Sequence, residues 1–136
     1  MTTRAAGTFE VKLSKQPLAD TGADPTLGRM SIDKKFSGDL QATGKGEMLM
    51  AGSPATGSAG YVAIERVEGT LHGRRGAFAL QHSATMHGGG QQLAIAVVPD
   101  SGTGELAGLS GSLAVDIVDG KHLYTFDYTL AKSPSA

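Results

Sequence analysis

Hydrophobic and polar residues alternate along most of the chain. In residues 7–13, Phe9, Val11 and Leu13 share one face, and the residues between them are polar. A period of two is typical of a half-buried β-strand. Similar patterns predict further strands at 27–36, 40–51, 59–71, 77–82, 91–98, 112–118 and 122–130. No window has a helical period longer than a turn or two, so the predicted fold class is all-β.

Glycine-containing turns separate these segments. Asp119-Gly120 lies between two alternating runs and predicts a type I′ hairpin, because both central residues of that turn need positive φ. The sequence Gly73–Gly76 predicts a second tight hairpin. About eight antiparallel strands in a chain of this size favour a closed or nearly closed β-barrel. We expect one domain over residues 1–136, with 1–6 and 132–136 as flexible tails.

Composition narrows the function classes. The chain has 136 residues, a net charge of −1 and no cysteine. Disulfides, thiolate catalysis and sulfur-rich metal sites are therefore excluded. Without a basic stripe, nucleic acid is not an expected partner. No apolar run approaches the ~20 residues of a membrane span, and no leader-like segment begins the chain, so we expect a cytoplasmic protein without membrane contact.

Glu65 interrupts an otherwise apolar stretch, and its direction has two interpretations. If Tyr61, Ala63 and Glu65 face the interior, burial of the carboxyl group raises its pKa and makes it an acid or base. If Val62 and Ile64 face inward, Glu65 lies outside and pairs with an arginine. The two β-branched residues favour the outward orientation on packing grounds.

His82 is the best single candidate for chemistry. It shares a face with Phe78 and Leu80 and, if that face is internal, supplies a base or a hydrogen-bond donor at the barrel mouth. The competing interpretation is a hydrogen-bonded histidine at a strand end, which is the more frequent role. We expect no metal site, because the spacing of the four histidines matches no metal-binding signature.

Several other side chains are candidates for the wall of an internal cavity. In 40–50, one face changes from small residues to Met48 and Met50, which suits a tapered interior that adapts to a ligand. Tyr61 and Tyr124 can direct hydroxyl groups into the same space, and Phe78 adds an aromatic wall. The alternative for each is ordinary core packing. No cofactor is implied.

The segment Ser101–Gly111 contains Gly-Thr-Gly, which invites comparison with a phosphate-binding loop. It lacks the Lys-Ser/Thr ending and a following helix, so we interpret it as a structural turn.

Three segments together resemble an uncharacterised bacterial family, the domain of unknown function DUF3224. They are Tyr61–Gly69, Gly73–His82 and Ser101–Gly111, supported by Lys35–Leu40 and Phe126–Tyr128. The glycine pattern at 102–111 is similar, more distantly, to allene oxide cyclases and dirigent proteins. That resemblance implies an eight-stranded barrel with an apolar cavity that forms dimers or trimers. The cyclases' catalytic glutamate and asparagine have no counterpart in Phe9–Leu13, where Glu10 lies opposite the apolar row.

Two functional hypotheses follow. The first is a barrel that binds an apolar or amphipathic small molecule and acts as a cofactor-independent isomerase or cyclase, with His82 and Glu65 as catalytic groups. The second is a non-enzymatic carrier, or a self-associating module with a filled barrel. Both predict a homo-oligomer, because strands at 59–67 and 113–118 carry apolar residues on both faces.

Overall fold

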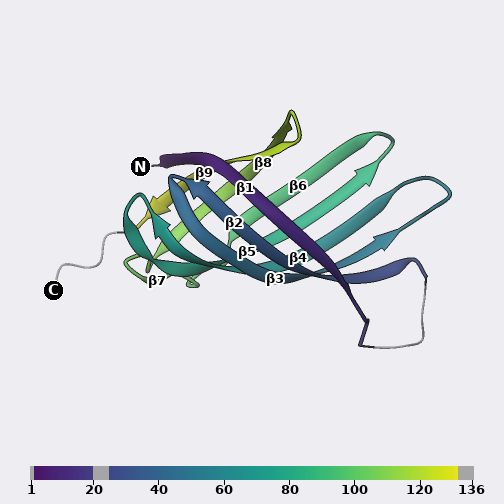
Figure 1. Cartoon of the computed structure of the whole chain (residues 1–136), viewed down its shortest axis with the longest axis horizontal. Helices are drawn as coiled ribbons and strands as arrows, with labels where there is room; N and C mark the ends of the chain where they lie inside the picture. The colour runs from purple at the N-terminus through teal and green to yellow at the C-terminus, as the bar shows by residue number, and fades with distance from the viewer. Residues whose placement is uncertain (1, 20–24, 132–136) are drawn as a thin grey trace.

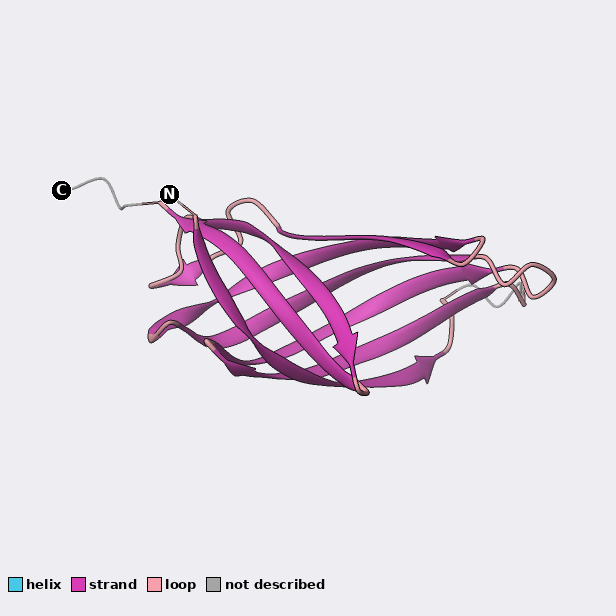
Figure 2. Ribbon diagram, turned by 90° about the horizontal axis from the view of Figure 1, so that it is seen from above, coloured by secondary structure: helices cyan, strands magenta, loops and turns pink. Residues whose placement is uncertain are grey.

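The computed structural model describes residues 2–19 and 25–131. These residues form an antiparallel β-barrel without helices (Figures 1 and 2). The strands are β1 (Thr3–Gln16), β2 (Leu27–Gly38), β3 (Leu40–Gly52), β4 (Ala59–Leu71), β5 (Arg74–His87), β6 (Gly90–Val97), β7 (Thr103–Gly104), β8 (Leu109–Val118) and β9 (Lys121–Leu130). The predicted all-β class is confirmed. No helix in the described part of the chain is long and apolar enough to cross a membrane.

The barrel closes through neighbouring pairs of long strands. Its order is β4-β3-β2-β1-β9-β8-β6-β5, and β5 pairs back to β4. The predicted closed barrel of about eight strands is therefore confirmed, with the two-residue β7 added beside β5. One seam is much shorter than the others, because β6 and β8 are paired only at Ala96 and Ser112.

The turns match the sequence pattern in one case and differ in another. Asp119 and Gly120 both have positive φ, 52° and 78°, as a type I′ hairpin needs. The predicted hairpin at Gly73–Gly76 is shifted: the turn is His72-Gly73, with φ of 47° and 80°, and β5 already begins at Arg74. A positive φ at a histidine is uncommon, so the sequence did not indicate this turn.

The first residues belong to the barrel. Thr3 pairs with Tyr128 in the ladder between β1 and β9, and Ala5 is fully buried. Residues 3–6 thus form strand, where the sequence predicted a tail. The predicted tail at 132–136 lies outside the described residues.

We call the end of the barrel that holds the β2–β3 and β4–β5 turns the closed end. Large side chains pack it solid, with Phe126 stacked on Phe78 at a ring separation of 5.8 Å. Leu106, on the loop between β7 and β8, is 1% exposed and plugs this end. The segment 101–111 is therefore a folding element, as predicted. Its glycines at 104 and 108 take the positive φ that its turns require.

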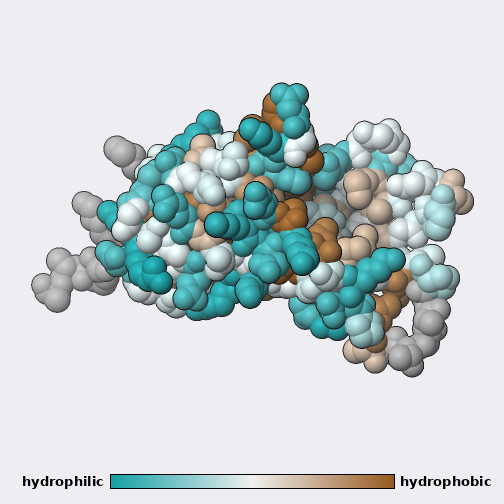
Figure 3. Space-filling view, in the orientation of Figure 1, coloured by the Kyte–Doolittle hydropathy of each residue, from teal (hydrophilic) through white to brown (hydrophobic). Residues whose placement is uncertain are grey.

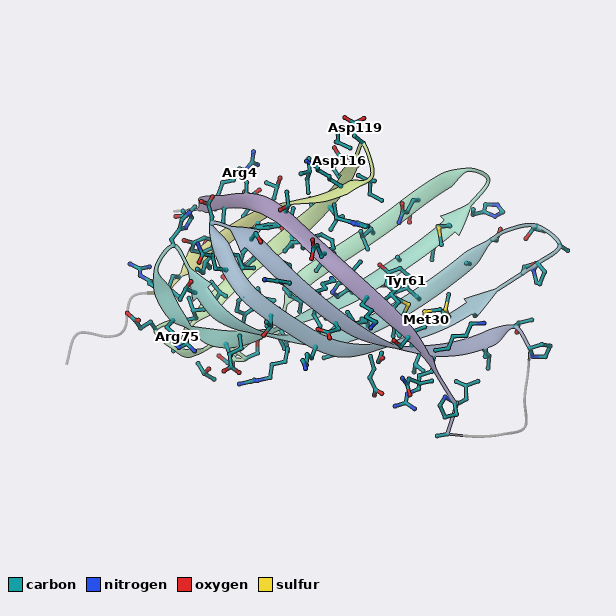
Figure 4. The ribbon with its side chains drawn as sticks, in the orientation of Figure 1. Arg4, Met30, Tyr61, Arg75, Asp116 and Asp119 are labelled. Atoms are coloured by element: carbon teal, nitrogen blue, oxygen red, sulfur yellow. The ribbon has the colours of Figure 1, made fainter. Side chains whose placement is uncertain are left out.

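The opposite end, which we call the open end, carries the β3–β4 and β5–β6 hairpin turns. Apolar side chains are partly exposed near it: Leu13 is 47% exposed and Leu93 36%. Figure 4 shows Tyr61 and Met30 toward this end and Arg75 at the closed end. Side chains thus fill the interior at the closed end, whereas at the open end apolar side chains are left partly exposed.

Candidate functional site

Three charged or titratable side chains meet inside the barrel. Glu65 from β4 is fully buried, and its Oε1 lies 2.8 Å from Lys34 Nζ of β2 and 2.7 Å from His82 Nε2 of β5. Lys34 and His82 are themselves 8% and 4% exposed. We call these three residues the Lys34–Glu65–His82 cluster. A buried carboxylate flanked by two donors forms strong, charge-assisted hydrogen bonds.

Glycine makes the cluster possible. Lys34 pairs with Gly44 across β2 and β3, so β3 lies between Lys34 and Glu65. A Cβ at Gly44 would lie 2.6 Å from Glu65 Oε2 and 3.5 Å from Lys34 Cβ. Because residue 44 has no side chain, the lysine can reach across β3 to the carboxylate on β4.

Two opposing effects set the pKa of Glu65. Burial is the largest single effect and raises the pKa, but hydrogen bonds and charge from His82 and Lys34 together outweigh it. The net pKa is lowered, so Glu65 is a carboxylate at neutral pH. The pKa of Tyr61 is raised, chiefly because Tyr61 is itself partly buried. The negative charge of Glu65 raises it further.

The hydrogen bonds fix the role of each histidine nitrogen. Glu65 Oε1 can only accept when ionised, so His82 donates from Nε2. Nδ1 is the other ring nitrogen, which in this tautomer of an imidazole is an acceptor, and no described residue forms a hydrogen bond with it. A carboxylate that orients an imidazole and leaves its other nitrogen free is the arrangement of a general base.

A cavity of about 180 Å³ lies above the cluster, toward the open end. Lys34, His82, Tyr61, Gln91 and His122 supply its polar lining. The rest of the wall is apolar, formed by Phe9, Val11, Leu13, Ile32, Met48, Leu93, Ile95 and Val115. Figure 3 shows a hollow with apolar surface beside the β8–β9 hairpin. An apolar cavity with a few convergent polar groups is the usual form of a small-molecule site.

Some of the predicted site residues lie at the cavity, and the others lie away from it. His82, Tyr61 and Met48 line the cavity, and Glu65 lies directly behind His82. Met50 is half-buried next to Gly28, beyond the cavity lining. The remaining two, Tyr124 and Phe78, lie toward the closed end.

Tyr124 has a structural contact instead of a ligand-facing one. Its hydroxyl accepts from Leu40 N at 2.9 Å and donates to Ser37 O at 2.9 Å. This fixes the β2–β3 turn to β9. Phe78 is 1% exposed and stacks on Phe126.

The favoured direction of Glu65 was wrong. Val62 and Ile64 are 54% and 51% exposed, whereas Glu65 faces the interior. Val67 and Leu71 share the parity of Glu65 and are buried, at 0% and 1% exposed. Because Val67 and Leu71 are buried at the closed end, alternation along β4 turns Glu65 inward as well. Lys34 supplies the positive charge that an internal carboxylate needs.

Lys34 was missed by sequence reasoning, although a signal existed. It has the same parity as Ile32 and Phe36, both of which are buried. A lysine on the apolar face of a predicted strand indicates a buried cation, since lysine is rarely buried unless it is paired. The adjacent Lys35 is exposed, so the two lysines point to opposite sides of the wall.

The titratable side chains outside the cluster do not add a metal-ligand set in the described part of the chain. In residues 2–19 and 25–131, no three His, Asp or Glu side chains converge as metal ligands. Glu10 is exposed on the outer face of β1, so it is remote from the cluster.

The chain is similar in sequence and in structure to known proteins of one family. The model of the family described as "Protein of unknown function (DUF3224)" matches residues 5–128. The chain belongs to the DUF3224 family. Its structure is also similar to a crystal structure of a DUF3224 protein with unknown function from Shewanella oneidensis MR-1, with a TM-score of 0.92 and 46% sequence identity. The match covers 98% of this chain and 100% of that one. No curated protein matches.

Membership in DUF3224 confirms the resemblance drawn from the sequence. It assigns no activity, since fold and family membership leave the chemistry to the site itself. In this DUF3224 barrel, the Lys34–Glu65–His82 cluster and its cavity are the features that bear on function.

Proposed function

We propose that the barrel binds a small, largely apolar molecule at its open end and moves a proton on it without a cofactor, as an isomerase or cyclase does. The observation that carries this proposal is the buried hydrogen bond of 2.7 Å between Glu65 and His82 at the floor of an apolar cavity. A filled barrel with no enzymatic role would not need a desolvated carboxylate and imidazole in its interior, because buried ionic groups are costly.

The proposed chemistry uses the two ring nitrogens of His82. Nδ1 accepts a proton from a carbon or hydroxyl group of the bound molecule, and the imidazolium that forms is stabilised by Glu65 through Nε2. Nδ1 then returns the proton to another atom of the same molecule. The net change is an isomerisation, with no oxidant, reductant or leaving group.

Lys34 is suited to stabilise the negative charge that develops on the molecule during this transfer. Lys34 Nζ and His82 Nε2 both contact Glu65 Oε1, at 2.8 and 2.7 Å, so the two donors lie no more than about 5.5 Å apart. An ammonium in a poorly hydrated cavity stabilises an oxyanion far more than it does in water. Tyr61, further along the cavity wall, is a second hydrogen-bond donor.

The test is a His82→Gln variant. The Gln amide can still donate to Glu65, but it has no basic nitrogen. The probe is cyclohexanone in D₂O, with incorporation of deuterium next to the carbonyl followed by NMR. We expect the unaltered protein to accelerate exchange and His82→Gln to lose about 10²–10⁴-fold of that acceleration. His87→Gln is the matched control, because His87 is an exposed histidine on the same strand.

The outcomes separate the functional hypotheses. Equal exchange in His82→Gln and the unaltered protein, with binding of the ketone retained, would favour a carrier over an enzyme. Native mass spectrometry of the purified protein would give the mass of any molecule that stays bound. A barrel that neither binds nor exchanges would favour the self-associating module.

Self-association is the second proposal, and one specific surface favours it. Leu49, Val62 and Ile64 form an exposed apolar row on the outer face of β3 and β4, each at least 51% exposed. The row is flanked by charges of both signs, including the Arg29–Glu47 ion pair. A surface carrying both signs can pair with a second copy of itself about a two-fold axis, with each charge facing its opposite.

We expect light scattering coupled to size-exclusion chromatography to give a dimer mass, and the single variant Ile64→Lys to give a monomer. Lysine placed in an apolar interface leaves a buried charge without a partner. Lys121→Glu, on the β8–β9 hairpin, serves as a charge-changing control away from the row. A monomer mass for the unaltered protein at micromolar concentration would contradict this proposal.

A further inference from the structure

The ammonium group of Lys34 has more donors than the protein satisfies. An ammonium carries three N–H donors. In the described part of the chain one acceptor is in reach, Glu65 Oε1 at 2.8 Å. The other close neighbours are the rings of Phe9 and Phe36, whose centroids lie 4.9 and 5.8 Å from Nζ. Rings stabilise the cation but accept no conventional hydrogen bond.

These remaining donors lie at the floor of the cavity. The Lys34 side chain is only 9% exposed, and Lys34 belongs to the cavity lining. A buried donor without an acceptor is costly, so the site favours a molecule that brings an acceptor oxygen to Nζ.

The charge around the cavity selects the kind of acceptor. The titratable groups that face it are Lys34 from β2, Tyr61 from β4, His82 from β5 and His122 from β9. The carboxylate of Glu65 lies behind His82, is fully buried and does not line the cavity. An incoming anion thus meets one cation and two imidazoles, with no carboxylate on the cavity wall.

We infer that the cavity binds an apolar acid in its anionic form, with its negatively charged head group on Lys34. This inference rests on the proposed function and specifies its ligand class. Glu65 Oε1 accepts from Lys34 Nζ, and the ammonium has further N–H donors at the cavity floor. An oxygen of the head group accepts from one of these donors, and Nδ1 of His82 stays free as the base.

The size and walls of the cavity limit the rest of the molecule. About 180 Å³ is the volume of roughly six water molecules, so only a short chain or a single ring fits beside the head group. The surrounding wall is mainly aliphatic, with Ile32, Leu93 and Val115 from three different strands. A longer apolar body would extend toward the open end.

The experiment is isothermal titration with straight-chain carboxylates from butanoate to octanoate, each paired with its uncharged amide. Every titration is made at about pH 7.5 in a buffer without anions that compete for Lys34. We expect a carboxylate to bind at least about tenfold more tightly than its amide, because a hydrogen bond between two charged groups is stronger than one to a neutral amide.

Lys34→Met tests the head-group contact and should abolish the preference for the carboxylate. Lys35→Met is its matched control, because Lys35 is the neighbouring lysine on the outer face. Carboxylates and amides are compared on the unaltered protein, so that comparison tests the inference even if Lys34→Met does not fold. Equal affinity for carboxylates and amides would overturn the anion inference and leave the proposed function standing. Binding of neither series, together with no exchange of cyclohexanone, would overturn both.

Discussion

Glu65→Gln is expected to lower the free energy of unfolding by about 3–5 kcal/mol. The amide keeps the shape of the side chain but removes its charge, which leaves the Lys34 ammonium buried without a counter-ion. Breaking one side of a buried ion pair is far more damaging than losing an exposed pair, for which the usual loss is at most about 1 kcal/mol. Urea denaturation followed by circular dichroism measures the difference.

Two further variants isolate the cause. Glu68→Gln removes an exposed carboxylate from the same strand and should change stability by less than about 0.5 kcal/mol. The double variant Lys34→Met/Glu65→Leu removes both charges together and should recover most of the loss, because apolar replacement of a buried pair is often neutral. A loss below about 1 kcal/mol in Glu65→Gln would show that the carboxylate and ammonium are not coupled as described.

The same carboxylate gives stability a pH dependence of known sign. Burial raises the folded-state pKa of Glu65, but the hydrogen bonds and charges of His82 and Lys34 lower it by a larger amount. The net folded-state pKa is therefore lowered. The unfolded state therefore binds more protons, and stability falls as pH decreases from about 5 through the folded-state pKa. Glu65→Gln should lack this part of the acid slope. Asp127, whose pKa is lowered chiefly by its hydrogen bond to Arg4, contributes in the same range and is removed by Asp127→Asn.

Phe126→Ala is expected to lower the free energy of unfolding by about 3–5 kcal/mol. Phe126 is fully buried at the closed end, between Phe78 and Tyr128, with ring separations of 5.8 and 5.4 Å. Its removal leaves a cavity that rigid strands cannot collapse to fill. Because the Lys34–Glu65–His82 cluster lies outside the closed end, binding of carboxylates at the open end should keep its affinity in the folded variant.

Ile117→Ala is the comparison for this prediction. Ile117 is a large apolar residue on β8 that is 63% exposed, so its truncation should change stability by less than about 0.5 kcal/mol. Similar losses in Phe126→Ala and Ile117→Ala would contradict the assignment of the closed end as the packed core. A changed ligand affinity in Phe126→Ala would show that the two ends of the barrel are coupled.

The sequence by itself determined the elements and the architecture. Alternation with a period of two predicts strands because successive side chains leave a strand on opposite sides. Asp119-Gly120 predicts its hairpin because few residue pairs tolerate positive φ twice in succession. The shared face of His82, Phe78 and Leu80 was also readable, since a strand keeps its alternation along its length, and the structure shows that this face is internal.

Only the tertiary structure decided which face of β4 is internal. Both faces of that strand carry apolar residues, Val62 and Ile64 on one and Val67 and Leu71 on the other, so alternation leaves two solutions. The barrel selects between them through packing at the closed end, where Val67 and Leu71 are required. That choice exposes Ile64 and places Glu65 inside.

The cluster itself is a product of the register between strands. Glu65 lies 31 residues from Lys34 and 17 from His82 in the chain, and no local pattern joins them. Ala63 of β4 pairs with His82 of β5, so Glu65, two residues further along β4, lies close to His82 on the inner face. On the other side of β4, Glu65 pairs with Gly46 of β3. Lys34 joins them because Gly44 leaves the space across β3 empty of side chain. Residue types were visible in the sequence, but their meeting point depends on strand pairing over long separations, which only the closed barrel fixes.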